Sequence, residues 1–188
     1  IESEIPLVVL NRISFFDKAL DHLAARRRRR VAVIASAGTL SHACLDALRH
    51  GSAARDLRLE PYWIQYASTR DPAAARNLAH LLFNGPARGR PNGLIVMDDS
   101  FVPHAAAGAM DAGVSMPGDL VLVAHTNFPY PTSAPAPVVR LGYDIPALLA
   151  TSRRMLIAQR ETRTRIPDTS ADALFEEEVV REAQGENP

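Results

Sequence analysis

The sequence has little cysteine, a single lysine and no excess of charge of either sign. One cysteine, Cys44, excludes an internal disulfide framework and any zinc site built from several cysteines. The 21 basic residues balance 21 acidic ones, so the chain as a whole has no net charge to attract it to nucleic acid or anionic lipid. If the protein acts on DNA, we expect another segment to make that contact.

The sequence also lacks a hydrophobic run that could cross a membrane. Its longest stretch without Asp, Glu, Lys or Arg, 120–139, contains four prolines that would break a helix in lipid, namely Pro129, Pro131, Pro135 and Pro137. We find no secretory signal in the sequence. Together with the single cysteine, these absences lead us to expect a cytoplasmic protein.

Short apolar runs of strand type alternate with segments in which apolar residues recur at helical spacing. This alternation predicts an α/β fold, with an open parallel sheet and helices on both of its faces. We predict strands at 5–10, 31–35, 62–66, 93–97, 120–124 and 138–141, and helices over about 15–23, 40–48, 71–83, 102–112 and 144–159.

One main α/β domain is predicted over residues 13–160. Residues 1–12 resemble a strand borrowed from another unit, and residues 161–188 should form a crossover strand and a C-terminal tail. Within the latter we expect a short edge strand or helix over 173–181 and a frayed tail after Gln184. For the helix over 144–159 we expect one apolar side, formed by Ile145, Leu148, Leu149, Met155 and Leu156.

Ligands of an open parallel sheet bind outside the carboxyl ends of its strands, which here selects the loops 35–40, 66–72, 98–103 and 125–131. The adjacent carboxylates of Asp98 and Asp99 are the most suggestive pair. Because neighbouring residues of a strand point to opposite sides, we expect only one of them to face a pocket. The alternative is that an aspartate here caps the next helix.

Several chemistries find no support in the sequence. The turn 36–39 has neither the lysine of a P-loop nor the glycine spacing of a dinucleotide site. The six histidines lack metal-ligand spacing, and no Gly-x-Ser-x-Gly motif marks a nucleophile. We therefore predict no catalytic residue, no metal and no cofactor. The arginines at 26–30 are interpreted as a solvated turn rather than a nucleic-acid patch.

Three segments together resemble a known family. The strand Gly93–Asp99, an alanine-rich helix, and the segment Ala112–Ala124 with its Gly-x-x-x-Pro-x-Asp motif resemble the effector-binding half of the lactose-repressor/galactose-repressor (LacI/GalR) family. The resemblance implies the C-terminal subdomain of a periplasmic-binding-protein-like fold. It also implies a small polar effector, such as a sugar or a related metabolite, and a DNA-binding head outside this chain.

At the site the sequence departs from the pattern of that family. No arginine clamp occurs in the turn and helix over 39–46, and the family's Gly-x-Asp-Asp is replaced by residues 124–127. Asp99 keeps the position of the family's effector-contacting aspartate, and Tyr66 could stack on a ligand. We predict an effector pocket lined by Thr39, Tyr66, Asp99 and Asn127.

The resemblance favours a ligand-sensing domain of a transcriptional regulator, with no reaction to catalyse. An exported periplasmic solute-binding protein of the same fold is the alternative. A third hypothesis, from the enzymes, is a small hydrolase or phosphatase that uses Asp98 or Asp99.

Small residues on nearly every face of the helix after Asp99 suit close helix approach. In the family this helix helps to form a two-fold interface, and a two-fold dimer would match paired DNA half-sites. We predict a homodimer with Ala105, Ala106, Ala109 and Met110 at its interface. The alternative is an interior helix packed tightly on the sheet.

Overall fold

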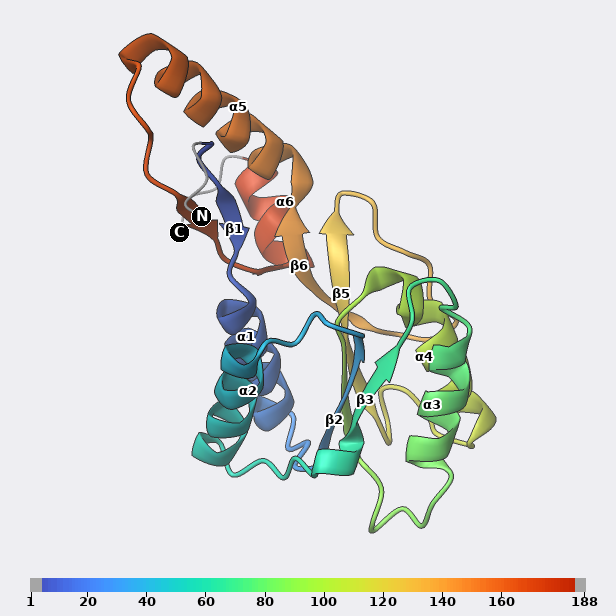
Figure 1. Cartoon of the computed structure of the whole chain (residues 1–188). Coiled ribbons are helices and arrows are strands. Elements are labelled where there is room, and N and C mark those ends of the chain that lie inside the picture. Colours follow the sequence, from blue (N-terminus) through green and yellow to red (C-terminus); the bar gives the residue numbers. More distant parts are fainter. Residues whose placement is uncertain (1–4, 185–188) are drawn as a thin grey trace.

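A six-stranded sheet forms the centre of the computed structural model, which describes residues 5–184 (Figure 1). Its strands lie in the order β3-β2-β4-β5-β6-β8, and all are parallel to their neighbours except β8, which is antiparallel to β6. This confirms the predicted parallel α/β sheet. The predicted tail after Gln184 lies outside the described residues. The strands are β2 (Val31–Ser36), β3 (Ile64–Ala67), β4 (Gly93–Val96), β5 (Val121–Phe128), β6 (Val139–Asp144) and β8 (Leu174–Phe175).

Helices cover both faces of this sheet, as Figure 1 shows. Helices α1 (Arg12–Ala25) and α2 (His42–Ala54) lie on one face, and α3 (Ala74–Phe83) and α4 (Val102–Asp111) lie on the other. Alternate residues of β2 therefore enter two cores: Ala32 and Ile34 pack with α3 and α4, and Val31 and Val33 pack with α1 and α2. Every residue of β2 is buried, and all of them except Ser36 are apolar.

Several element boundaries differ from the sequence prediction. The strand expected at 62–66 starts as the 3-10 turn η1 (Pro61–Trp63), since a proline suits the first position of a helical turn. Strands β5 and β6 are each longer than predicted at their carboxyl ends; in β5 the half-buried His125 and Asn127 alternate there with the buried Thr126 and Phe128.

A second, two-stranded sheet stands beside the main one. Strand β1 (Val8–Leu10) pairs in parallel with β7 (Thr169–Ala171), and the side chain of Asn11 bonds that of Asp172 at 2.7 Å just beyond this pair. Helix α5 (Ile145–Thr162) runs away from the main sheet toward this small sheet, and α6 (Glu176–Gln184) packs beside β8 (Figure 1). No helix within residues 5–184 is long and apolar enough to span a membrane.

The predicted apolar side of α5 is only partly covered. Met155 is buried, and Leu148 packs against the core that contains α1. Leu149 and Leu156, which belong to the predicted apolar side, are exposed by 65% and 51%. They have the right helical spacing, but residues 5–184 leave both side chains largely exposed.

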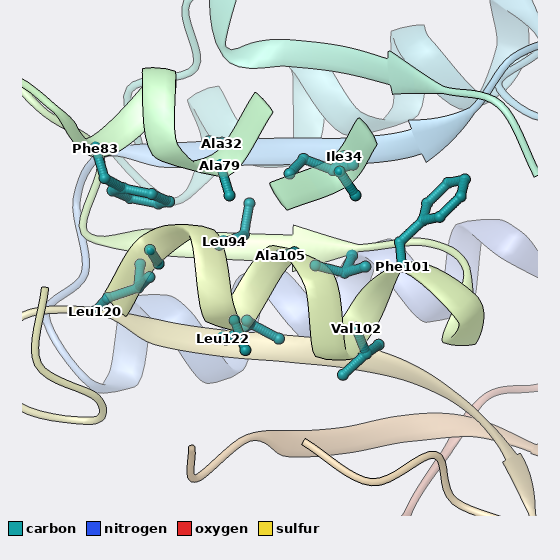
Figure 2. Packing of buried hydrophobic residues seen from close by; sticks show 14 of the residues in the cluster. Ala32, Ile34, Ala79, Phe83, Leu94, Phe101, Val102, Ala105, Leu120 and Leu122 are labelled. Atoms are coloured by element: carbon teal, nitrogen blue, oxygen red, sulfur yellow. The ribbon is translucent and has the colours of Figure 1, made fainter. Parts of the chain in front are cut away.

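Helix α4 lies in the interior. Ala105, Ala106 and Ala109 are fully buried against the sheet and α3, and Figure 2 shows Ala105 among the buried side chains of this core. These three alanines therefore offer no surface to a second copy of the chain, which corrects their predicted place at a dimer interface. The tight interior packing is the alternative that holds for them. Met110, at 47% exposure, is the one residue of the predicted interface that reaches solvent.

The arginines at 26–30 form a turn at the amino edge of the sheet, but they are more than a solvated turn. Arg28 donates to the carbonyl oxygens of Pro117 and Gly118 at 2.9 and 2.8 Å. Arg30 donates to the carbonyl oxygen of Arg90 at 2.6 Å. These guanidinium groups therefore fasten neighbouring loops to one another.

Candidate functional site

A cavity of about 210 Å³ opens at the carboxyl edge of the main sheet, where β2, β4, β5 and β6 meet the junction between β1 and α1. This is the edge at which the fold class places its ligands. The volume lies below the range of roughly 300–1,000 Å³ that holds drug-sized ligands, so the cavity suits a small metabolite. Its lining residues are Leu10, Arg12, Phe15, Ser36, Thr39, Met97, Asp98, Asp99, His125, Asn127 and Tyr143.

Both aspartates line this cavity, although only one was expected to face it. Asp98 ends the extended segment and caps the 3-10 turn η2 (Asp99–Phe101), accepting hydrogen bonds from the backbone N–H and the hydroxyl of Ser100 at 3.1 and 2.5 Å. Asp99 accepts a bond at 2.7 Å from the side-chain amide of Asn127. The prediction failed because the turn starts at Asp99, which ends the alternation of a strand.

The cavity brings together three of the four predicted effector residues. Thr39 lies in the loop after β2, where its hydroxyl donates to the carbonyl oxygen of Ser36 at 2.7 Å. Asp99 and Asn127 come from the ends of β4 and β5 and bond each other across the gap between them. Tyr66 stands on β3, at the outer edge of the sheet; it is 44% exposed and outside the lining.

The guanidinium group of Arg12 also lines the cavity, although the sequence analysis did not select this residue. Arg12 lies in the first turn of α1, which Asn11 caps by accepting the backbone N–H of Ser14 at 3.1 Å. Its Nη1 donates to the carbonyl oxygen of Thr39 at 2.6 Å. The lining of the cavity thus includes an arginine, although none occurs within residues 39–46. The signal that could have found it was its position just after the strand predicted at 5–10.

His125 forms a further part of the wall that the sequence analysis missed. Its ring lies 5.8 Å from those of Phe15 and Tyr143, centroid to centroid, and its Nδ1 is buried without a hydrogen-bond partner among the described residues. Burial lowers the pKa of His125 below its ordinary value, and the charges of Asp99 and Asp98 only partly oppose this. The imidazole is therefore neutral at neutral pH.

Tyr143 joins the cavity to the small sheet. Its hydroxyl donates to the backbone carbonyl of Asn11 at 3.1 Å, next to Arg12. Burial raises the pKa of Tyr143 to about 12, so this hydroxyl keeps its proton at every physiological pH. The hydrogen bond from Tyr143 thus connects the wall of the cavity to the junction between β1 and α1.

No metal site emerges from the described part of the chain, where no three His, Cys, Asp or Glu side chains gather closely enough to hold an ion. The polar groups of the cavity instead offer separate hydrogen-bond donors and acceptors. Such a set can orient a small polar molecule without covalent chemistry.

The chain matches a family model described as a periplasmic binding protein-like domain over residues 20–176. No curated protein matches the sequence. Solved structures of LacI-family regulators share the fold: one from Chloroflexus aggregans has a TM-score of 0.80 at 17% identity, over 93% of this chain and 63% of its own. One from Bifidobacterium animalis has 0.77 at 15% identity, over 90% of this chain and 61% of its own.

A third structure, a LacI-family transcriptional regulator from Lactobacillus casei with bound glucose, has a TM-score of 0.71 at 15% identity, over 89% of this chain and 62% of its own. At these identities the likeness concerns the fold. The chain spans about three fifths of the length of each of these structures.

Proposed function

Since the chain belongs to the family of periplasmic binding protein-like domains, we propose that it is the effector-sensing part of a LacI-type bacterial transcriptional regulator. The observation that carries this proposal is the small polar cavity at the carboxyl edge of the sheet, whose wall includes the junction with β1. No reaction is needed for this role. The family and the solved relatives, which are regulators, favour binding over the hydrolase hypothesis.

The proposed effector is a small hydroxylated molecule, such as a sugar or a related metabolite. Asp99 and Asn127 offer an acceptor and an amide, and Thr39 offers a hydroxyl; these three remain the proposed contacts, and Arg12 joins them. Tyr66 is left out, because it lies outside the cavity. The glucose bound by the Lactobacillus casei regulator supports this class of ligand.

A second subdomain should complete the cleft in the intact protein. Several large apolar side chains are exposed around β1 and along α5. Exposed apolar side chains that lie together commonly mark a surface on which another part of a protein packs. The solved relatives contain further chain that this one does not span. We infer that a first subdomain packs there and that a DNA-binding head precedes it. The exposed apolar residues are Leu7, Val9, Leu149, Leu156 and Ile157.

We further propose that the regulator is a cytoplasmic homodimer that binds operator DNA through its head. Since three of the four predicted interface residues are buried, we move the proposed contact to an apolar groove between η1 and α3. There Tyr62 and Leu81 are exposed by 61% and 73%. The groove is lined by Tyr62, Trp63, Gln65, Leu78, Leu81 and Leu82. An exported solute-binding protein remains the alternative, because the family model describes that fold as well.

A titration of the full-length protein with monosaccharides tests the effector site. We expect a thermal-shift screen to find a hit, and calorimetry to show that Asp99→Ala weakens its binding about tenfold to a hundredfold. A hydrogen bond to a charged group such as this half-buried carboxylate contributes about 1.5–3 kcal/mol. Asp46→Ala, at an exposed carboxylate on α2, is the matched control. A hit whose affinity is unchanged by Asp99→Ala would place the effector elsewhere.

A further inference from the structure

The cavity contains more negative than positive charge. Its lining includes the carboxylates of Asp98 and Asp99 but only one guanidinium group, that of Arg12. His125 adds no positive charge, because burial lowers its pKa and keeps it neutral. Among the lining residues of this chain there is therefore one more negative than positive charge.

The charged groups of the lining are also not paired with one another. No ion pair within residues 5–184 involves Arg12, Asp98 or Asp99, and Arg12 donates instead to a backbone carbonyl. Each carboxylate uses one oxygen for its bonds to Ser100 or Asn127. The second oxygen of each accepts no hydrogen bond from the described residues. Two acceptor atoms with charge thus remain for a ligand.

These groups differ in what they would accept from a ligand. A carboxylate oxygen accepts hydrogen bonds from a hydroxyl or an ammonium group, but only the ammonium group also brings a positive charge that compensates the charge of the carboxylate. The free donors of Arg12 need an acceptor, which a hydroxyl oxygen supplies. The buried Nδ1 of His125 can accept one more donor, provided that the proton of the neutral ring is on Nε2.

From this arrangement we infer that the preferred effector is a cationic amino sugar or amino polyol, with its ammonium group on Asp98 and Asp99 and a hydroxyl oxygen on Arg12. The inference rests on the proposed function and names the class of its ligand. A neutral sugar would satisfy the same hydrogen bonds. It would leave the excess negative charge of a partly enclosed cavity without a counter-charge, which lowers its affinity relative to the amine.

Matched series of one sugar scaffold test this inference on the full-length protein. The probes are glucose, glucosamine and N-acetylglucosamine, with the corresponding galactose and mannose series, titrated calorimetrically at a mildly acidic pH at which the amines are protonated. In the series that binds, the amine should bind about tenfold more tightly than the parent sugar and the acetylated form. Raising the salt concentration should narrow this difference.

Two substitutions should move the preference in opposite directions. Asp99→Asn removes the excess negative charge of the lining and should abolish most of the preference for the amine over its parent sugar. Arg12→Gln increases the excess negative charge and should increase that preference. Asp46→Asn on the exposed surface of α2 should leave it unchanged. Because the two cavity variants act with opposite sign, a general loss of folding in one of them cannot imitate the expected pattern.

The outcomes separate this inference from the proposed function. If a neutral sugar binds as tightly as its amine, or if Asp99→Asn and Arg12→Gln shift the ratio in the same direction, the inference is overturned and the sugar-sensing function stands. If no member of any series binds, both are overturned.

Discussion

Replacing Gly108 with alanine should force helices α3 and α4 apart. A Cβ atom at this position would lie 2.1 Å from the carbonyl oxygen of Arg76 and 3.0 Å from the Cβ of Ala79. The first of these atoms belongs to the backbone of α3, so it can give way only if that helix moves. A separation of about 1 Å is needed to restore an ordinary contact. The same movement would stretch the ion pair between Arg76 and Asp111 that joins the two helices.

The size of the effect follows from two opposing contributions. Forcing a methyl group into a well-packed contact costs about 1–3 kcal/mol, and a rigid backbone neighbour points to the upper end of that range. Alanine recovers about 1 kcal/mol over glycine through its helix propensity. The free energy of unfolding should therefore fall by about 2 kcal/mol. For a domain of this size, that is a decrease in Tm of about 4–8 °C.

Urea and thermal denaturation of the two variants Gly108→Ala and Gly85→Ala provide the test. Gly85 is an exposed loop residue, and a Cβ there would meet no atom within 4 Å, so its variant should stay within about 0.5 kcal/mol of the parent. If Gly108→Ala is as stable as this control, the two helices do not approach closely and the interior position of α4 is refuted.

Three further predictions concern pH and assembly. Burial lowers the pKa of His125 below 6.5, so its protonation disfavours the folded state, and the free energy of unfolding should decline as the pH falls below about 6.5. His125→Gln should remove the part of this decline that His125 causes. An equally steep decline in the variant would contradict the prediction. Burial opposes the ionisation of Glu178, but its hydrogen bonds, including that from Lys18, outweigh this and hold its pKa below 4.5. The contribution of Glu178 to the free energy of unfolding should therefore be present above pH 4.5 and disappear as the pH falls through the lowered pKa. In acid titrations, the free energy of unfolding of Glu178→Gln should fall less steeply with pH than that of the parent. Finally, light scattering on the full-length protein should show the proposed dimer converted to monomer by Leu81→Glu but not by Met110→Glu. A dimer that persists in Leu81→Glu would place the interface outside the groove.

Most of the main sheet could be predicted from the sequence, because a strand with helices on both sides must be apolar at every position. Residues 31–35 of β2 and all four residues of β4 have this property, and neither run shows the periodicity of an amphipathic helix. Helix α5 shows the limit of such patterns. The spacing of Leu149 and Leu156 indicates an apolar face, but spacing does not say what covers that face.

The small residues of α4 had two equally good interpretations. Alanine and glycine allow close approach by any helix, whether it belongs to the same subunit or to a second one. Only the three-dimensional structure decides between them, because it places the backbone of α3 against Gly108 and leaves the neighbouring alanines no access to solvent.

The residues of the candidate site that follow the ends of parallel strands could be predicted from the sequence. Those that reach the cavity from other elements could not be predicted in this way. Thr39, Asp99 and Asn127 lie beyond the ends of parallel strands, and the sheet brings them together whatever the rest of the chain does. Arg12 enters from the other direction, through its helix at the end of β1 and its bond to the Thr39 carbonyl. Since Tyr143 also bonds the backbone of this junction, an effector that contacts Arg12 would act directly on the segment that leads to the small sheet. We therefore expect Arg12, which lies at the end of β1, to be the residue through which a ligand in this cavity changes the position of the small sheet.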